Sequence, residues 1–123
     1  MSKLLLLALC LSLPAMVSVA GTINTDVTQA SLKQTVCAAG YVQSIRPLSS
    51  YTQAWEKLND GGLDTIVDHK TPLCAGGHPT DDANLQLQFK PESYRKDVTE
   101  RLVCKLLCEG KLTLKQAQGM FWQ

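Results

Sequence analysis

The chain has few aromatic residues, almost no net charge and no internal repeat. Two Trp, three Tyr and two Phe make up 6% of the 123 residues, which is too few for a large platform that stacks nucleic-acid bases. The absence of a repeat excludes solenoids and propellers. A formal net charge of +1 weighs against a high-affinity, sequence-tolerant nucleic-acid binder, which usually carries excess positive charge. With 45% hydrophobic and 19% charged residues, the composition is that of a single globular domain.

Long apolar runs are also missing, apart from one at the start of the chain. Lys3 precedes the ten apolar or small residues 4–13, and the small residues Ser18 and Ala20 suit the −3 and −1 positions of a cleavage site. The run is too short to span a bilayer. We therefore predict a signal peptide over 1–20 and one exported domain over 21–123, periplasmic or secreted and with no membrane contact after cleavage.

Removal of Lys3 leaves 11 basic and 11 acidic residues, but their distribution is uneven. Between Lys90 and Lys115 there are seven basic and four acidic residues. This segment is either a solvated helix face or a patch that faces phosphate groups.

Four cysteines remain after removal of the predicted signal: Cys37, Cys74, Cys104 and Cys108. An even number in an exported domain favours two disulfides, with three pairings open. The alternative is a zinc site of Cys74, Cys104 and Cys108 with His78, which an oxidising compartment disfavours.

Hydrophobic periodicity and capping signals predict an α+β chain. Helices are expected over 26–37, 50–58, 91–108 and 113–120, and strands over 41–45, 63–67 and 85–89. In the long helix, the residues expected to face inward are Tyr94, Val98, Leu102, Val103, Leu106 and Leu107.

The chemistry lies in the strand, loop, strand and helix at the centre. Asp68-His69 is followed by Pro72-Leu73, by Gly76-Gly77 and then by Asn84-Leu85-Gln86. This spaced pattern resembles the HNH endonucleases, also called ββα-metal nucleases. The resemblance implies a ββα-metal core with flanking helices, held by disulfides.

The resemblance also implies roles for three residues. Asp68 would offer carboxylate oxygen to a divalent cation, Mg²⁺ first, with Mn²⁺ or Zn²⁺ as alternatives. His69 would take a proton from the attacking water. Asn84 would bind across the loop and hold the imidazole or the loop backbone.

A subgroup of small, often exported HNH proteins extends the resemblance over residues 26–118. The subgroup pattern contains cysteines at the positions of Cys37 and Cys108, so one bridge is expected there and the second between Cys74 and Cys104. It also contains an Arg-Pro like Arg46-Pro47. Arg46, Arg95 and Lys96 are therefore the candidate contacts to substrate phosphate.

The chain departs from the family at the second metal ligand, a His or Asn in the helix. That position falls at Ser93, with Glu92 beside it, and both are candidate ligands. Lys96, Asp97 or Glu100 could instead take part, since the subgroup has these residues. The predicted function is a metal-dependent endonuclease, monomeric and acting on nucleic acid, DNA before RNA. The alternative is an inactive module of the same fold that binds nucleic acid or protein.

Overall fold

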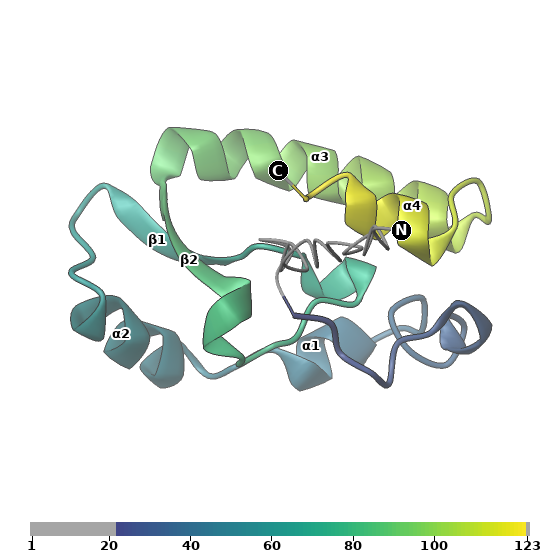
Figure 1. Cartoon of the computed structure of the whole chain (residues 1–123), viewed down its shortest axis with the longest axis horizontal. Coiled ribbons are helices and arrows are strands. Elements are labelled where there is room, and N and C mark those ends of the chain that lie inside the picture. Colours follow the sequence, from purple (N-terminus) through teal and green to yellow (C-terminus); the bar gives the residue numbers. More distant parts are fainter. Residues whose placement is uncertain (1–21, 123) are drawn as a thin grey trace, which may run out of the picture.

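A β-hairpin and the helix that follows it form the centre of the fold (Figure 1). The computed structural model describes residues 22–122, so the predicted signal peptide lies outside the described residues. The helices are α1 (Tyr41–Ile45), α2 (Ser49–Leu58), α3 (Lys90–Cys108) and α4 (Leu114–Gly119), and the strands are β1 (Thr65–His69) and β2 (Leu85–Phe89). The two strands pair antiparallel, with Asp68 opposite Gln86 and His69 opposite Leu85. The predicted α+β class is confirmed.

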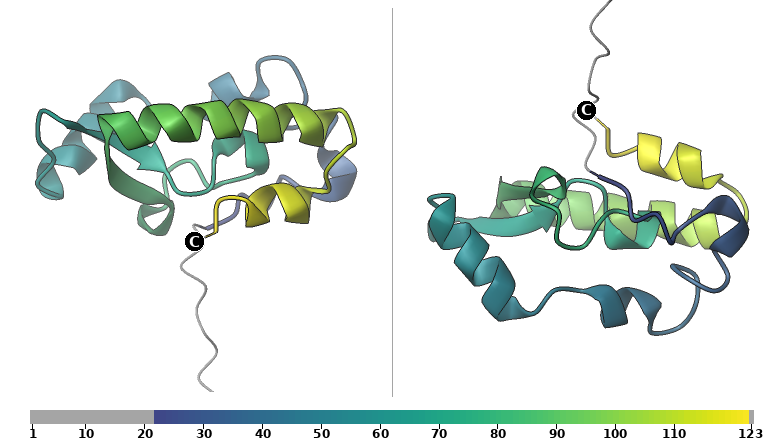
Figure 2. Two further views of the ribbon diagram at one scale, coloured as in Figure 1. Left: turned by 90° about the horizontal axis from the view of Figure 1, so that it is seen from above. Right: turned by 60° about the horizontal axis from the view of Figure 1, so that its bottom comes forward.

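The hairpin lies between α3 on one side and α2 on the other (Figures 1 and 2). The α4 helix packs against α3 and against a single 3₁₀ turn, Leu73–Ala75, in the loop between the strands. The hydrophobic core lies around the second half of α3, away from the hairpin. Its buried members are Val27, Leu32, Val36, Ala75, Val103, Leu107, Leu114 and Ala117.

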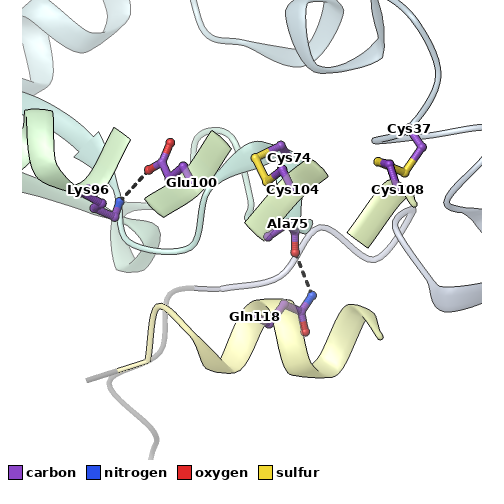
Figure 3. Close-up of a disulfide and its surroundings, with 8 residues drawn as sticks. All are labelled: Cys37, Cys74, Ala75, Lys96, Glu100, Cys104, Cys108 and Gln118. Atoms are coloured by element: carbon purple, nitrogen blue, oxygen red, sulfur yellow. Dashed lines mark hydrogen bonds and ion pairs between the residues drawn. A yellow bond between two sulfur atoms is a disulfide. The ribbon is translucent and has the colours of Figure 1, made fainter. Parts of the chain in front are cut away.

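Two disulfides attach other parts of the chain to α3 (Figure 3). Cys37 pairs with Cys108, and Cys74 pairs with Cys104, so the predicted pairing is confirmed. The zinc alternative is wrong, because its three thiols are consumed in these bridges. Two bridges in a small domain are typical of an oxidising compartment outside the cytosol. No helix within residues 22–122 is long and apolar enough to cross a bilayer.

The segment 41–45 is the helix α1 and not the predicted strand. Its alternation of apolar and polar residues also fits a helix, because Tyr41, Val42 and Ile45 share one face at helical spacing. These three are half-buried, whereas Gln43 and Ser44 are exposed. Tyr41 and Val42 pack against the core, so burial selects the helical period.

The predicted helix over 26–37 is reduced to one 3₁₀ turn, Gln29–Ser31, followed by irregular turns. Thr28 caps that turn, but Cys37 N–H bonds five residues back to the Leu32 carbonyl. Val27, Leu32 and Val36 are all buried in the core while Cys37 reaches Cys108. Tertiary packing and the bridge therefore override a weak helical preference in a segment rich in Thr, Ser and Val.

The predicted inward face of α3 is wrong in its first half. Tyr94, Val98 and Leu102 are exposed by 62%, 59% and 57%. Val103 and Leu107 of the predicted face are buried, and the third buried residue of α3 is Ser93, which was not predicted to face inward. The first half of α3 covers polar groups of the hairpin, so its inward positions are polar and the apolar stripe faces outward.

The two strands are close to the prediction. The second strand matches 85–89, whereas the first runs over Thr65–His69 instead of 63–67. A turn closed by Thr65 Oγ1, which accepts from Gly62 N–H at 2.9 Å, takes up Leu63 and Asp64. Asp68 and His69 form the last two positions of β1, at the end of the strand as predicted.

A single buried side chain closes the loop that joins the strands. Asn84 is 0% exposed, and its Oδ1 accepts from Thr71 N–H at 2.9 Å. Its Nδ2 donates to the carbonyls of Thr71 and His78 at 3.0 and 2.8 Å. A Cβ on Gly77 would lie 1.8 Å from the Thr71 oxygen, so only glycine fits beside these hydrogen bonds. Asn84 thus holds the loop backbone, one of the two roles predicted for it.

We expect Asn84→Ala to lower the free energy of unfolding by about 3 kcal/mol, because three buried backbone groups lose their partner. Asn84→Asp should cost a similar amount, because an acceptor would replace the donor that faces two carbonyls. Chemical denaturation measures both. Asn59→Ala is the control, since Asn59 makes one exposed bond to the Trp55 carbonyl. A loss of unfolding free energy at Asn84 no larger than at Asn59 would contradict a stabilising role for the Asn84 hydrogen bonds.

Candidate functional site

A cleft of about 350 Å³ opens between the end of β1, the first half of α3 and the segment before α2. Asp68 and His69 enter it from β1, and Arg46 enters it from the end of α1. Ser93, Asp97 and Glu100 line it from α3, at the spacing that places residues on one helix face. The cleft therefore brings together four of the residues predicted for the site: Arg46, Asp68, His69 and Ser93.

His69 is held in one orientation by the loop. Its Nε2 lies 2.8 Å from the Pro79 carbonyl oxygen, and because a carbonyl only accepts, Nε2 carries the proton. In the neutral ring Nδ1 then has the lone pair, and it has no hydrogen-bond partner within residues 22–122. Burial lowers the pKa of the imidazole, an effect that the Pro79 bond and Asp68 oppose and that Arg46 and Lys96 reinforce. His69 is thus a neutral, oriented proton acceptor at neutral pH.

Asp68 forms an ion pair with a lysine from α3. The Lys96 ammonium contacts Asp68 Oδ2 and the His69 carbonyl. It also lies 3.1 Å from Glu100 Oε1, and Figure 3 shows this last pair. Both side chains of the Asp68–Lys96 pair are only 14% exposed. Burial raises the pKa of the Glu100 carboxyl, and Lys96 opposes that rise. Lys96 therefore acts as the internal counter-ion of two half-buried carboxylates.

Not every residue predicted for the site faces the cleft. Ser93 is 2% exposed and forms part of the cleft wall, whereas Glu92 is exposed and does not line the cleft. Arg95 and Lys96 line a second cavity and not the cleft. His78 is half-buried, and its Nδ1 accepts from Asp81 N–H at 3.0 Å, so it stabilises the loop.

Two features of the site were not predicted from the sequence. The i, i+4 spacing of Lys96 and Glu100 signals a possible pair on a helix, but contact with Asp68, 28 residues away, has no local signal. The Pro79 carbonyl that orients His69 has none either, because any residue supplies a backbone carbonyl.

The donor atoms in the cleft decide which metal the site fits. Asp68, Asp97 and Glu100 offer only oxygen, which suits a hard cation such as Mg²⁺ that keeps most of its water and binds through one or two carboxylates. Within residues 22–122 no three His, Cys, Asp or Glu side chains cluster closely enough to hold an ion. These oxygen donors are of the kind that a hydrated Mg²⁺ prefers, but Asp68 is paired with the Lys96 ammonium.

The chain was compared with protein-family models, with curated proteins and with solved structures, and none of the three comparisons finds a match.

We expect His69 in chelator-treated protein to titrate below its ordinary pKa of 6.5. Arg46→Gln should raise the midpoint, because the guanidinium disfavours the imidazolium. The unfolded chain protonates at 6.5 and the folded chain at a lower pH, so the free energy of unfolding should fall as pH drops through this window. Proton NMR of the imidazole checks the midpoint, and a value at or above 6.5 would contradict the buried neutral ring.

We expect Lys96→Met to lower the free energy of unfolding by about 2 kcal/mol, because two half-buried carboxylates lose their counter-ion. The control is Lys105→Met, whose exposed pair with Glu109 at 3.9 Å should contribute less than about 1 kcal/mol. Adding Asp68→Asn should restore part of the loss, because the lone carboxylate is then removed. Additive losses from Lys96→Met and Asp68→Asn would show that the two groups do not interact.

Proposed function

We propose that the protein is an exported, metal-dependent endonuclease of the HNH type that hydrolyses phosphodiester bonds in nucleic acid, DNA before RNA. The observation that carries the proposal is the oriented His69 imidazole, with a free Nδ1 and a lowered pKa, beside Asp68 and Arg46 in one cleft. Two further observations support it. The hairpin runs directly into α3, and Asn84 closes the loop between the strands.

Each of the cleft residues has its own role in the proposed hydrolysis. His69 Nδ1 takes a proton from the water that attacks phosphorus, while the Pro79 carbonyl keeps the ring from turning. The Arg46 guanidinium binds the phosphate. Asp68 would hold Mg²⁺, with Mn²⁺ as the alternative, and the cation when bound neutralises the phosphate and the leaving oxygen. Glu92 and Ser93 stay candidate ligands from the resemblance, but Asp97 and Glu100 lie in the cleft and offer better oxygen donors than Ser93.

A specific observation favours the second candidate, a binding module of the same fold without catalysis. The Lys96 ammonium already neutralises Asp68 and Glu100. A metal cation at Asp68 would be repelled by the nearby Lys96 ammonium. In a protein that binds no metal, the same ammonium stabilises the two carboxylates. Catalysis therefore requires that Lys96 turns toward Glu100 or toward substrate phosphate when metal binds.

The two candidates are separated by a nicking assay on supercoiled DNA and on single-stranded DNA and RNA. The protein starts at Gly21 and is made with both disulfides formed. We expect cutting with Mg²⁺ or Mn²⁺ that chelator abolishes. His69→Gln should lower the rate by about 10²- to 10⁴-fold, as expected for removal of a general base, and Asp68→Asn should abolish the metal-dependent cutting.

The control for Asp68→Asn is Asp60→Asn, at an exposed turn position with positive φ that Asn tolerates. It should leave cutting unchanged. Folded, disulfide-bonded protein that cuts none of the three substrates with either metal would overturn the hydrolase in favour of the binding module.

A further inference from the structure

A second cavity, of about 390 Å³, is lined by Lys96, whose ion-pair partners Asp68 and Glu100 line the cleft. We call it the basic pocket. One wall is the face of the hairpin that carries Gln86 and Gln88, and a second is α3. The third is formed by Met120 and Phe121, just after α4. Three separate parts of the chain thus enclose it, in the region where α3, the hairpin and the C-terminal segment approach one another (Figure 2).

The charge of the basic pocket has one sign. Lys70, Arg95 and Lys96 line it, and no carboxylate does. Lys96 is engaged with Asp68 and Glu100, but neither Lys70 nor Arg95 forms an ion pair within residues 22–122. Two cations without partners on a concave surface suit a phosphate group.

The rest of the lining suits a base. Gln88 Oε1 is buried and has no hydrogen-bond partner within the described residues, so this side chain would gain a partner if it turned toward a donor on a ligand. Met120 and Phe121 supply the apolar part of the lining, and the Lys96 ammonium lies over the Phe121 ring, 5.8 Å from its centroid. Amide groups that bind a base edge beside an aromatic ring are the usual means of holding an unpaired base.

Lys96 is the partition between the basic pocket and the cleft. Lys96 lines the pocket, while its partners Asp68 and Glu100 line the cleft. A strand whose phosphate lies at His69 could therefore place a neighbouring nucleotide beyond the partition.

We propose that the basic pocket binds one unpaired nucleotide of a single-stranded nucleic acid, with its phosphate on Lys70 and Arg95 and its base between Gln88 and Phe121. This inference rests on the proposed function for its choice of ligand. A paired base is stacked inside a duplex and would have to leave it to enter a concave pocket, at a cost in unpairing energy. Single strands are therefore the preferred substrate class.

The test measures binding and not cutting. Fluorescence anisotropy of a labelled twelve-nucleotide oligothymidylate is recorded with the His69→Gln protein in chelator, against the same strand annealed to its complement. We expect the single strand to bind more tightly than the duplex. Lys70→Gln with Arg95→Gln should weaken single-strand binding about tenfold or more and reduce the magnitude of the slope of log K against log salt by about 1.4, the loss of two phosphate contacts. Phe121→Leu should weaken binding by about 5-fold to 100-fold.

Matched controls keep the charge and ring changes but move them out of the pocket. Arg101→Gln with Lys115→Gln removes two exposed cations that do not line it, and Trp122→Leu removes the neighbouring ring. Because Phe121→Leu could loosen the fold, thymidine monophosphate is also titrated into ¹⁵N-labelled protein, where the Gln88 side-chain amide should shift. Equal losses in pocket and control variants, tighter duplex binding, or an unmoved Gln88 amide would each overturn the pocket.

The two proposals fail separately. A protein that binds single strands through the pocket but cuts nothing overturns the hydrolase and leaves the pocket standing. A protein that cuts, but whose binding ignores Lys70, Arg95 and Phe121, overturns the pocket alone.

Discussion

The arrangement of the site depends on the buried carboxamide of Asn84. It satisfies both backbone groups of Thr71 and the carbonyl of His78, so the loop between the strands is closed by hydrogen bonds that exclude water. The next carbonyl along the chain, that of Pro79, orients the His69 ring. A fully satisfied polar network in a low-dielectric interior is rigid, because each lost bond leaves an uncompensated group. The orientation of a candidate general base is therefore set by a side chain that does not touch it.

The α3 helix divides into two halves with different duties. Its second half carries Val103 and Leu107 into the core and holds both disulfides through Cys104 and Cys108. Its first half turns polar residues toward the hairpin and separates two cavities with Lys96. A small domain has little apolar surface to bury, so the bridges at one end compensate for the polar site at the other.

The failures of prediction follow from this division. The apolar stripe of Tyr94 and Val98 is the strongest periodic signal in the first half of α3, yet it faces solvent. Hydrophobic periodicity locates an apolar core, and it misidentifies the inward face of a helix where that face is polar. The segment at 41–45 failed for another reason, since five residues fit a period of 2 and a period of 3.6 almost equally well.

The sequence by itself determined which residues make up the central motif and which strands carry them. Asp68 and His69 end one strand and Asn84 precedes the next, because these are local spacings set by the geometry of a hairpin. The cysteine pairing followed from the resemblance, and the structure agrees. Only the tertiary structure decided that Lys96 meets Asp68 and that Arg46 shares a cleft with His69. These partners are 20 or more residues apart, and contacts at that range are chosen by packing, which leaves no period in the sequence.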